Sequence, residues 1–230
     1  MNSCSISVIL VAGGKGTRMG SPIPKQYLPL SGKPIVLHSF FLFAQIPGVK
    51  EIIVVCEEQY RPLFPLLEYP RVHFAQPGQR RQDSVWNGFC RVAHDAELVC
   101  IHDSARPLLC NEDCLAVLEE GRKHGAAVLA TPVKYTIKSA SQDSFVKETI
   151  PRADLWEIQT PQVIAPEWLR QGFAKASAQN DLTVTDDVSL VELLGRPVKL
   201  VPGSDCNIKI TTPADYAFAE SIFPTSPACV

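Results

Sequence analysis

An apolar segment near the start of the chain runs directly into a loop rich in glycine and basic residues. The loop reads Gly13-Gly14-Lys15-Gly16-Thr17-Arg18-Met19-Gly20, and Pro24-Lys25-Gln26 follows it closely. Glycines lack Cβ, so their backbone N–H groups can approach an anion and adopt the positive φ angles that aim successive amides at one point. Arg18 adds a planar fork of donors and Lys25 a mobile point charge. The segment therefore predicts a cradle for the phosphates of a nucleoside triphosphate.

Two better-known phosphate motifs do not fit this spacing. A P-loop requires a glycine where Ile9 stands and a hydroxyl residue where Gly16 stands. A dinucleotide fingerprint requires a third glycine where Met19 stands. For the loop taken alone, the remaining alternative is a tight turn between a strand and a helix that binds nothing.

Two further residues have the chemistry that a triphosphate site needs. Asp103 follows the apolar run Leu98–His102, which places a carboxylate at the ligand edge of a predicted sheet, where it could bind Mg²⁺. The alternatives for Asp103 are a helix cap or a salt bridge with Arg106. Lys209 lies in a short alternating run, and its alternative is an ordinary surface lysine.

Composition excludes several classes of function. The 230 residues contain 22 Lys and Arg against 24 Asp and Glu, so a net charge of -2 gives no general attraction to nucleic acid or to anionic membranes. The N-terminal apolar run is interrupted at Gly13, which is too early for a signal peptide or a membrane span. Eight scattered cysteines also fit a reducing compartment, so the protein is expected to be cytoplasmic.

Short β-branched runs alternate with segments of helical periodicity through much of the chain. The expected strands are Ile6–Ala12, Ile52–Cys56, Val72–Ala75, Leu98–His102 and Ala126–Thr131. The expected helices are Pro34–Gln45, Gln59–Leu67, Gln82–Val92 and Asn111–His124, the last with Asn111 as a candidate cap. This alternation predicts an α/β fold: a single Rossmann-like domain over residues 1–230, with a mainly parallel mixed sheet flanked by helices.

The alternation breaks after Thr131. The segments Tyr135–Ser139 and Phe145–Ile150 flank a polar turn and predict a protruding β-hairpin arm at about residues 133–150. A two-stranded arm is marginal alone in water, so we expect it to pack against the same arm of a second subunit, the alternative being an exposed edge hairpin. Helices at Glu167–Ala178, Asp187–Leu194 and Ala214–Ile222 and a strand at Val198–Pro202 complete the expected fold, before a frayed tail from Thr225.

With these segments in place, the chain resembles the nucleotidyltransferases that join a nucleoside monophosphate to a sugar or polyol phosphate. The glycine loop and Pro24-Lys25-Gln26-Tyr27-Leu28 carry this resemblance. The following downstream segments make the chain similar, in order and over nearly its whole length, to the 2-C-methyl-D-erythritol 4-phosphate cytidylyltransferase family: Gly78-Gln79-Arg80-Arg81-Gln82-Asp83-Ser84-Val85, Ile101-His102-Asp103-Ser104-Ala105-Arg106-Pro107, Thr160-Pro161-Gln162, Thr185-Asp186-Asp187 and Asn207-Ile208-Lys209.

The resemblance implies a reaction and a role for each matching residue. Methylerythritol phosphate would attack the α-phosphorus of CTP, with Mg²⁺ as cofactor, and pyrophosphate would leave. An ionised phosphate nucleophile needs no general base, so positioned cations carry the catalysis. The implied catalytic residues are Arg18, Lys25 and Lys209. The implied CTP-binding residues are Ala12, Gly13, Gly14, Gly78, Ser84, Asp103, Ser104 and Lys209. The implied acceptor-binding residues are Asp103, Arg152, Thr160 and Thr185, with Asp103 also as the metal ligand.

The resemblance further implies a homodimer in which Arg152, beyond the arm, serves the partner's site. Arg81 and Arg106 are expected to organise the surrounding loops. Two other functions stay open at this point. Ribitol 5-phosphate cytidylyltransferases share the glycine loop and the Pro-Lys-Gln segment, and a nucleotide-binding regulator without catalysis could be built on the same fold.

Overall fold

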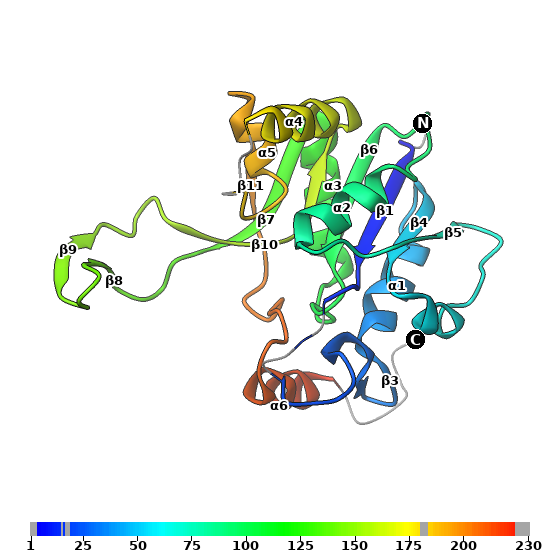
Figure 1. Cartoon of the computed structure of the whole chain (residues 1–230), viewed down its shortest axis with the longest axis horizontal. Helices are drawn as coiled ribbons and strands as arrows, with labels where there is room; N and C mark the ends of the chain where they lie inside the picture. The colour runs from blue at the N-terminus through cyan, green and yellow to red at the C-terminus, as the bar shows by residue number, and fades with distance from the viewer. Residues whose placement is uncertain (1–3, 15, 17–18, 180–183, 224–230) are drawn as a thin grey trace.

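A seven-stranded mixed sheet organises the chain (Figure 1). The computed structural model describes residues 4–14, 16, 19–179 and 184–223, and the strand order is β11-β7-β10-β6-β1-β4-β5. The strands are β1 (Ile6–Val11), β4 (Val49–Val55), β5 (Arg71–Ala75), β6 (Leu98–Asp103), β7 (Ala126–Pro132), β10 (Trp156–Ile164) and β11 (Lys199–Pro202). Strand β1 pairs in parallel with both β4 and β6, so it lies inside the sheet and the loops after these three strands meet at one edge.

Helices cover both faces of this sheet, as the alternating pattern predicts. They are α1 (Ile35–Gln45), α2 (Arg81–Phe89), α3 (Asn111–His124), α4 (Pro166–Ala178) and α5 (Ser189–Leu193), while α6 (Pro213–Ile222) lies elsewhere. Val8 and Leu10 of β1 pack in one buried cluster with α1 and α3, whereas Ile9 packs in a second cluster with α2, α4 and α5. Strand β1 is therefore buried on both faces, which explains its continuous apolar sequence.

The expected arm is a hairpin of β8 (Ile137–Ala140) and β9 (Val146–Ile150). Figure 1 shows it standing away from the sheet at the end of two long connections that leave β7 and return to β10. The division of the chain into one domain over residues 1–230 stays a prediction, and Thr225 lies outside the described residues.

The carboxy-terminal helix α6 lies away from the main sheet, beside a small antiparallel pair of β2 (Pro29–Leu30) and β3 (Lys33–Pro34) (Figure 1). Ile210 and Ala219 form a buried cluster with Leu30 and Ile35. This cluster joins the segment after Lys25 to the segment that carries Lys209, although the two are far apart in the sequence.

Three local expectations are corrected. Strand β10 was not expected, because its polar residues Gln159, Thr160 and Gln162 are buried and disrupt the apolar run that would signal a central strand. The expected helix at 59–67 is instead the 3₁₀ helix η3 (Glu58–Leu63), which contains Pro62 and so lacks a backbone donor there. Residue 111 is already inside α3, and Cys110 caps the helix by accepting from Asp113 N through its Sγ at 3.4 Å.

None of the helices in the described part of the chain has the length and apolar character that crossing a bilayer requires.

Candidate active site

A cavity of about 840 Å³ opens at the carboxyl ends of β1 and β6. Its walls are the glycine loop after β1, the 3₁₀ turn η2 (Lys25–Tyr27), the amino-terminal turn of α2, the end of β6 and the segment around Lys209. The predicted site residues that line it are Gly13, Gly14, Lys25, Gly78, Ser84, Asp103, Ser104 and Lys209. Residues from five separate parts of the sequence thus meet at the sheet edge where a ligand is expected.

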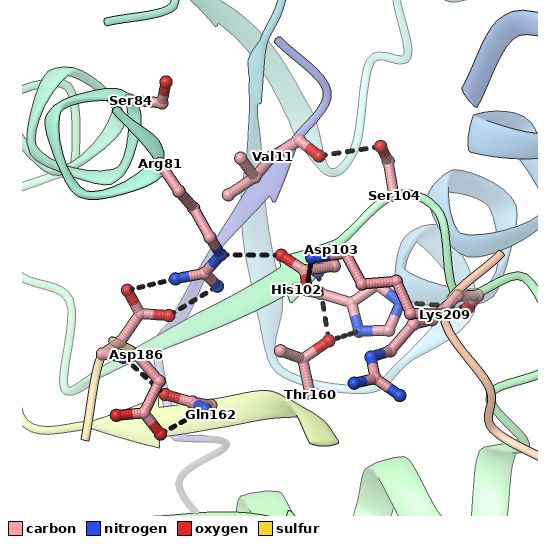
Figure 2. A network of polar contacts seen from close by, with 12 residues as sticks. Val11, Arg81, Ser84, His102, Asp103, Ser104, Thr160, Gln162, Asp186 and Lys209 are labelled. Atoms are coloured by element: carbon pink, nitrogen blue, oxygen red, sulfur yellow. Dashed lines mark hydrogen bonds and ion pairs between the residues drawn. The ribbon is translucent and has the colours of Figure 1, made fainter. Parts of the chain in front are cut away.

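Asp103 is the centre of an ion-pair network at the floor of this cavity (Figure 2). Arg81 Nε donates to Asp103 Oδ1 at 2.9 Å, and Lys209 Nζ donates to Asp103 Oδ2 at 2.7 Å. The two terminal nitrogens of Arg81 donate to the two carboxylate oxygens of Asp187 at 2.9 and 2.8 Å. One carboxylate therefore fixes Lys209 to β6, and one guanidinium joins α2 to the loop before α5. Asp103 forms a salt bridge, as one alternative anticipated, but with Arg81 and Lys209 rather than Arg106.

The two carboxyl groups bound by Arg81 respond differently to their surroundings. Burial favours the neutral form of Asp103, but the positive charges of Arg81 and Lys209 outweigh burial and hold its pKa below the usual range. Burial raises the pKa of Asp187, and the negative charges of Asp103 and Asp186 raise it further, while Arg81 acts in the opposite direction. Asp103 is thus firmly ionised where it faces the cavity, because it has two cationic partners.

A second layer of hydrogen bonds holds Asp103 from behind. Thr160 Oγ1 accepts from Asp103 N at 3.1 Å and lies 3.0 Å from His102 Nδ1. His102 Nε2 lies 3.2 Å from the carbonyl oxygen of Arg106, which can only accept, so Nε2 carries the proton and Nδ1 accepts from Thr160. Burial lowers the pKa of His102 to about 3, so the ring stays neutral. The hydroxyl proton of Thr160 is therefore used inside the protein, beneath the cavity.

The segment before α2 approaches the cavity closely because it contains Gly78. A Cβ at this position would lie 2.3 Å from Asp83 Cβ and 2.8 Å from its carbonyl carbon. Gly78 N donates to Ser84 Oγ at 2.9 Å, so Ser84 ties this segment to the first turn of α2. The amino-terminal turn of α2 carries a partial positive charge and faces the cavity, so it is placed to bind an anion there.

The loop of Thr185-Asp186-Asp187 is held by Gln162 of β10. Gln162 Oε1 accepts from Asp187 N at 2.8 Å and from Val188 N at 2.9 Å, while its Nε2 donates to Asp186 Oδ2 at 3.1 Å. Figure 2 shows Gln162 and Asp186 below Arg81, on the side of the network opposite Lys209. Two of the sequence segments that carried the resemblance therefore interlock through one buried amide.

Arg152, Thr185 and Ala12 do not line this cavity. Arg152 is exposed at the base of the arm, where its Nη1 donates to the carbonyl oxygen of Lys134. Thr185 is exposed on the loop that Gln162 holds. Ala12 lines a small neighbouring void, and Arg18 lies outside the described residues. Ser104, although it lines the cavity, donates its hydroxyl proton to Val11 O at 2.7 Å.

Sequence reasoning missed the parts played by Asp187, Gln162 and His102. All three belong to the segments of the resemblance, but roles were given only to their neighbours. The available signal was the presence of a polar side chain next to a buried apolar strand, because such a group must find a partner inside the fold.

The donor set at Asp103 fits a Mg²⁺ that a triphosphate brings with it. The carboxylate is ionised, lines the cavity and has about four lone-pair sites, of which Arg81 and Lys209 use two. Among the described residues there is no group of three or more His, Cys, Asp and Glu side chains that could hold a metal ion. Phosphate oxygens and water would therefore have to supply the other ligands, as Mg²⁺ prefers.

Comparison with known proteins gives one consistent result. The family model IspD, 2-C-methyl-D-erythritol 4-phosphate cytidylyltransferase, matches residues 6–225. A chloroplastic 2-C-methyl-D-erythritol 4-phosphate cytidylyltransferase from Oryza sativa subsp. japonica is 52% identical over 222 residues, which are 95% of this chain and 74% of that protein. The protein of the same name from Chlamydia pneumoniae is 44% identical over 216 residues, 94% of this chain and 98% of that one.

Solved structures agree with the sequence relatives. The 4-diphosphocytidyl-2C-methyl-D-erythritol synthase from Anaerococcus prevotii DSM 20548 is similar with a TM-score of 0.82 and 29% identity, over 96% of this chain and 98% of that one. The 2-C-methyl-D-erythritol 4-phosphate cytidylyltransferase from Francisella tularensis gives a TM-score of 0.81 and 28% identity, over 94% of this chain and 99% of that one. The expected α/β fold is confirmed.

The network predicts that Arg81→Met is strongly destabilising. The substitution leaves Asp187 buried without its cation, so we expect a loss on the order of 3 kcal/mol in the free energy of unfolding, measured by urea denaturation. The neighbouring Arg80→Met is the matched control, because Arg80 pairs with Asp83 at the surface, where ion pairs contribute little. Equal midpoints for the two variants would contradict the assigned role of Arg81.

The buried His102 predicts a loss of stability in mild acid. In the unfolded chain His102 takes up a proton near pH 6.5, whereas its pKa in the folded protein is about 3. The free energy of unfolding therefore falls as the pH drops from 6.5 towards 3. From pH 7 to pH 5 the single group should cost roughly 2 kcal/mol. Urea denaturation at both pH values should show a loss smaller by this amount in His102→Gln than in the unsubstituted protein. An identical loss in both would mean that His102 titrates normally.

Proposed function

The chain belongs to the 2-C-methyl-D-erythritol 4-phosphate cytidylyltransferase family, and from this premise we propose how its residues carry out the reaction. The protein is a nucleotidyltransferase of non-mevalonate isoprenoid biosynthesis, which joins CTP and methylerythritol phosphate. The observation that carries the assignment of the site is the meeting of Gly13, Gly14, Lys25, Asp103 and Lys209 around one cavity at the carboxyl ends of β1 and β6.

The nucleotide occupies the side of the cavity formed by the glycine loop and α2. Gly13 and Gly14 offer closely approaching backbone, and Gly78 with Ser84 forms the facing wall. A Cβ on Gly13 would lie 2.4 Å from Pro77 Cβ, so only glycine allows these two walls to come so near. Backbone amides and the amino terminus of α2 together suit the triphosphate of CTP.

Lys25 and Lys209 stabilise the charge that develops during transfer. The acceptor phosphate is already ionised near neutral pH, so attack on the α-phosphorus needs orientation and compensating charge rather than a base. Lys209 is oriented by Asp103, and Lys25 is only 9% exposed, so one cation is fixed in direction and the other is shielded from water. Positioned charge in such a site is the largest single source of rate enhancement in many enzymes. Arg18 remains the third proposed cation.

Asp103 is the residue that would hold Mg²⁺ together with phosphate oxygens. The ion would neutralise charge on the triphosphate and on the pyrophosphate that leaves. Asp103, Thr185 and Arg152 are proposed for the acceptor. Thr160, whose hydroxyl is committed to His102 and Asp103, contributes to the acceptor site by fixing Asp103 in place.

We place Arg152 in the site of a second subunit, so the functional unit is a homodimer joined through the arm. The hairpin carries large apolar side chains at its surface, with Tyr135 80% exposed and Phe145 74% exposed. A two-stranded hairpin gains stability when such side chains are covered. Arg152 is exposed and donates from Nη1 to the carbonyl oxygen of Lys134, so the rest of its guanidinium can reach an anion of the partner's site.

A reducing compartment suits the chain, as its cysteines suggest. The rice relative is named as chloroplastic, so we propose a cytoplasmic or organellar location according to the host.

The decisive test of the function is pyrophosphate release by the purified protein with CTP and Mg²⁺. We expect release with 2-C-methyl-D-erythritol 4-phosphate and none without an acceptor, because the acceptor phosphate is the nucleophile. Ribitol 5-phosphate is the discriminating arm, and a higher kcat/KM with it would overturn the acceptor assignment. Lys25→Ala should lower kcat by about 10²-fold or more, because it removes transition-state charge stabilisation.

The shared site predicts that two inactive variants restore each other. In a mixture of Arg152→Ala and Lys25→Ala subunits, each hybrid dimer holds one site free of both substitutions, so random exchange should recover about a quarter of the original activity. Native mass spectrometry verifies that hybrids form. If hybrid dimers form in the expected proportion but show no activity, Arg152 acts in the site of its own subunit.

A further inference from the structure

The side chain of Gln26 connects the glycine loop to the turn that carries Lys25. Gln26 is 3% exposed, and its single amide nitrogen donates to Ala12 O at 2.7 Å and to Gly14 O at 2.8 Å. The Tyr27 hydroxyl donates to the same oxygen of Ala12 at 2.8 Å. Three donated hydrogen bonds from η2 therefore hold two carbonyl oxygens on either side of Gly13.

This arrangement fixes the direction of a backbone amide. In a trans peptide the C=O and N–H groups point in opposite directions, so the peptide whose Ala12 oxygen faces Gln26 must turn the N–H of Gly13 away from it. Within the described part of the chain, no protein acceptor takes a hydrogen bond from Gly13 N–H or Gly14 N–H. Both glycines line the large cavity. Unpaired amides at the cavity are what an anion needs, and inward carbonyl oxygens would repel one.

The same anchor sets the position of Lys25. Residues 25–27 form one 3₁₀ turn, so whatever holds Gln26 and Tyr27 also holds the backbone of Lys25. On the other side, a Cβ at Gly16 would lie 3.0 Å from Lys25 N, so the glycine loop and this turn are in direct contact. The loop amides and the lysine therefore keep a fixed relation to each other only while η2 stays attached.

Glutamine has the donor geometry that this position requires. Its amide offers two hydrogens in a plane, one for each carbonyl oxygen, and it carries no charge that would offset Lys25. A glutamate would present lone pairs to both carbonyl oxygens. A methionine has a similar volume but donates nothing.

We infer that Gln26 is a positioning residue for cytidylyl transfer: it holds the carbonyl oxygens of Ala12 and Gly14 away from the cavity, so that the glycine-loop amides and Lys25 meet the triphosphate in a fixed arrangement. The inference rests on the proposed function of the cavity and extends it to a residue that does not itself touch the reacting atoms. Its side chain acts through the loop and not on the substrate.

The test is the affinity of Gln26→Met for CTP, measured by calorimetry with Mg²⁺ and without the acceptor. Loss of hydrogen bonds that organise charged recognition should weaken CTP binding by about tenfold or more, with a parallel fall in kcat. The KM for methylerythritol phosphate should change less than twofold, because the acceptor side of the cavity does not depend on η2. Gln171→Met, on the outer surface of α4, is the matched control and should bind CTP normally.

Each outcome decides a separate question. If the unsubstituted protein binds no CTP, the proposed function of the cavity fails. If it binds CTP and Gln26→Met binds equally well with unchanged kcat, the inference about Gln26 fails. A general loss of folded protein would lower apparent kcat without changing the Kd of the folded fraction, so it would also count against positioning. Tyr27→Phe removes one donor to the Ala12 oxygen and should weaken CTP binding in the same direction, so it carries the test if Gln26→Met does not fold.

Discussion

The placement of two positive side chains on the two oxygens of Asp103 is the interaction on which the site depends. A carboxylate buried at the end of a central strand is stable only when cations compensate it, and here Arg81 and Lys209 do so from different parts of the chain. Arg81 also binds Asp187. The buried charge of Asp103 therefore fixes the positions of α2, of the loop before α5 and of the Lys209 segment relative to one another. The ion pairs therefore act as constraints on position, and their value lies in that rather than in net stability.

Those constraints work because the sheet supplies a rigid reference. Val11 and Asp103 are partners in the β1–β6 register, so the glycine loop and the carboxylate begin from adjacent points. Ser104 closes the same junction by donating to Val11 O from both its backbone and its hydroxyl. On the far side, Ile210 N donates to Ala105 O, which draws the Lys209 segment against the end of β6. The loops around the cavity thus take a fixed geometry from the paired strands β1 and β6.

The fold and the cavity wall could be predicted from sequence because their signals are local. The apolar runs 6–12 and 98–102 predict buried parallel strands, and functional side chains that directly follow such strands lie at the same edge of the sheet. Partners across the chain leave no such signal: nothing near Asp187 indicates that Arg81, more than a hundred positions earlier, compensates it. Strand β10 could not be predicted for the same reason. Its glutamines and Thr160 can be buried because they form hydrogen bonds with partners that are distant in the sequence.

A balanced network also explains how the site can remain ordered before substrate arrives. Asp103 and Asp187 together offset Arg81 and Lys209, so these four groups have no net charge, and Lys25 also lines the cavity. Lys209, whose side chain is 37% exposed, is already oriented and partly removed from water by Asp103. In the proposed reaction Lys209 would exchange Asp103 for a substrate phosphate, or bind both, and would lose little further freedom. Under the proposed mechanism, much of the ordering that transfer requires is therefore complete in the folded protein, which is how fixed charges would accelerate a reaction that uses no general base.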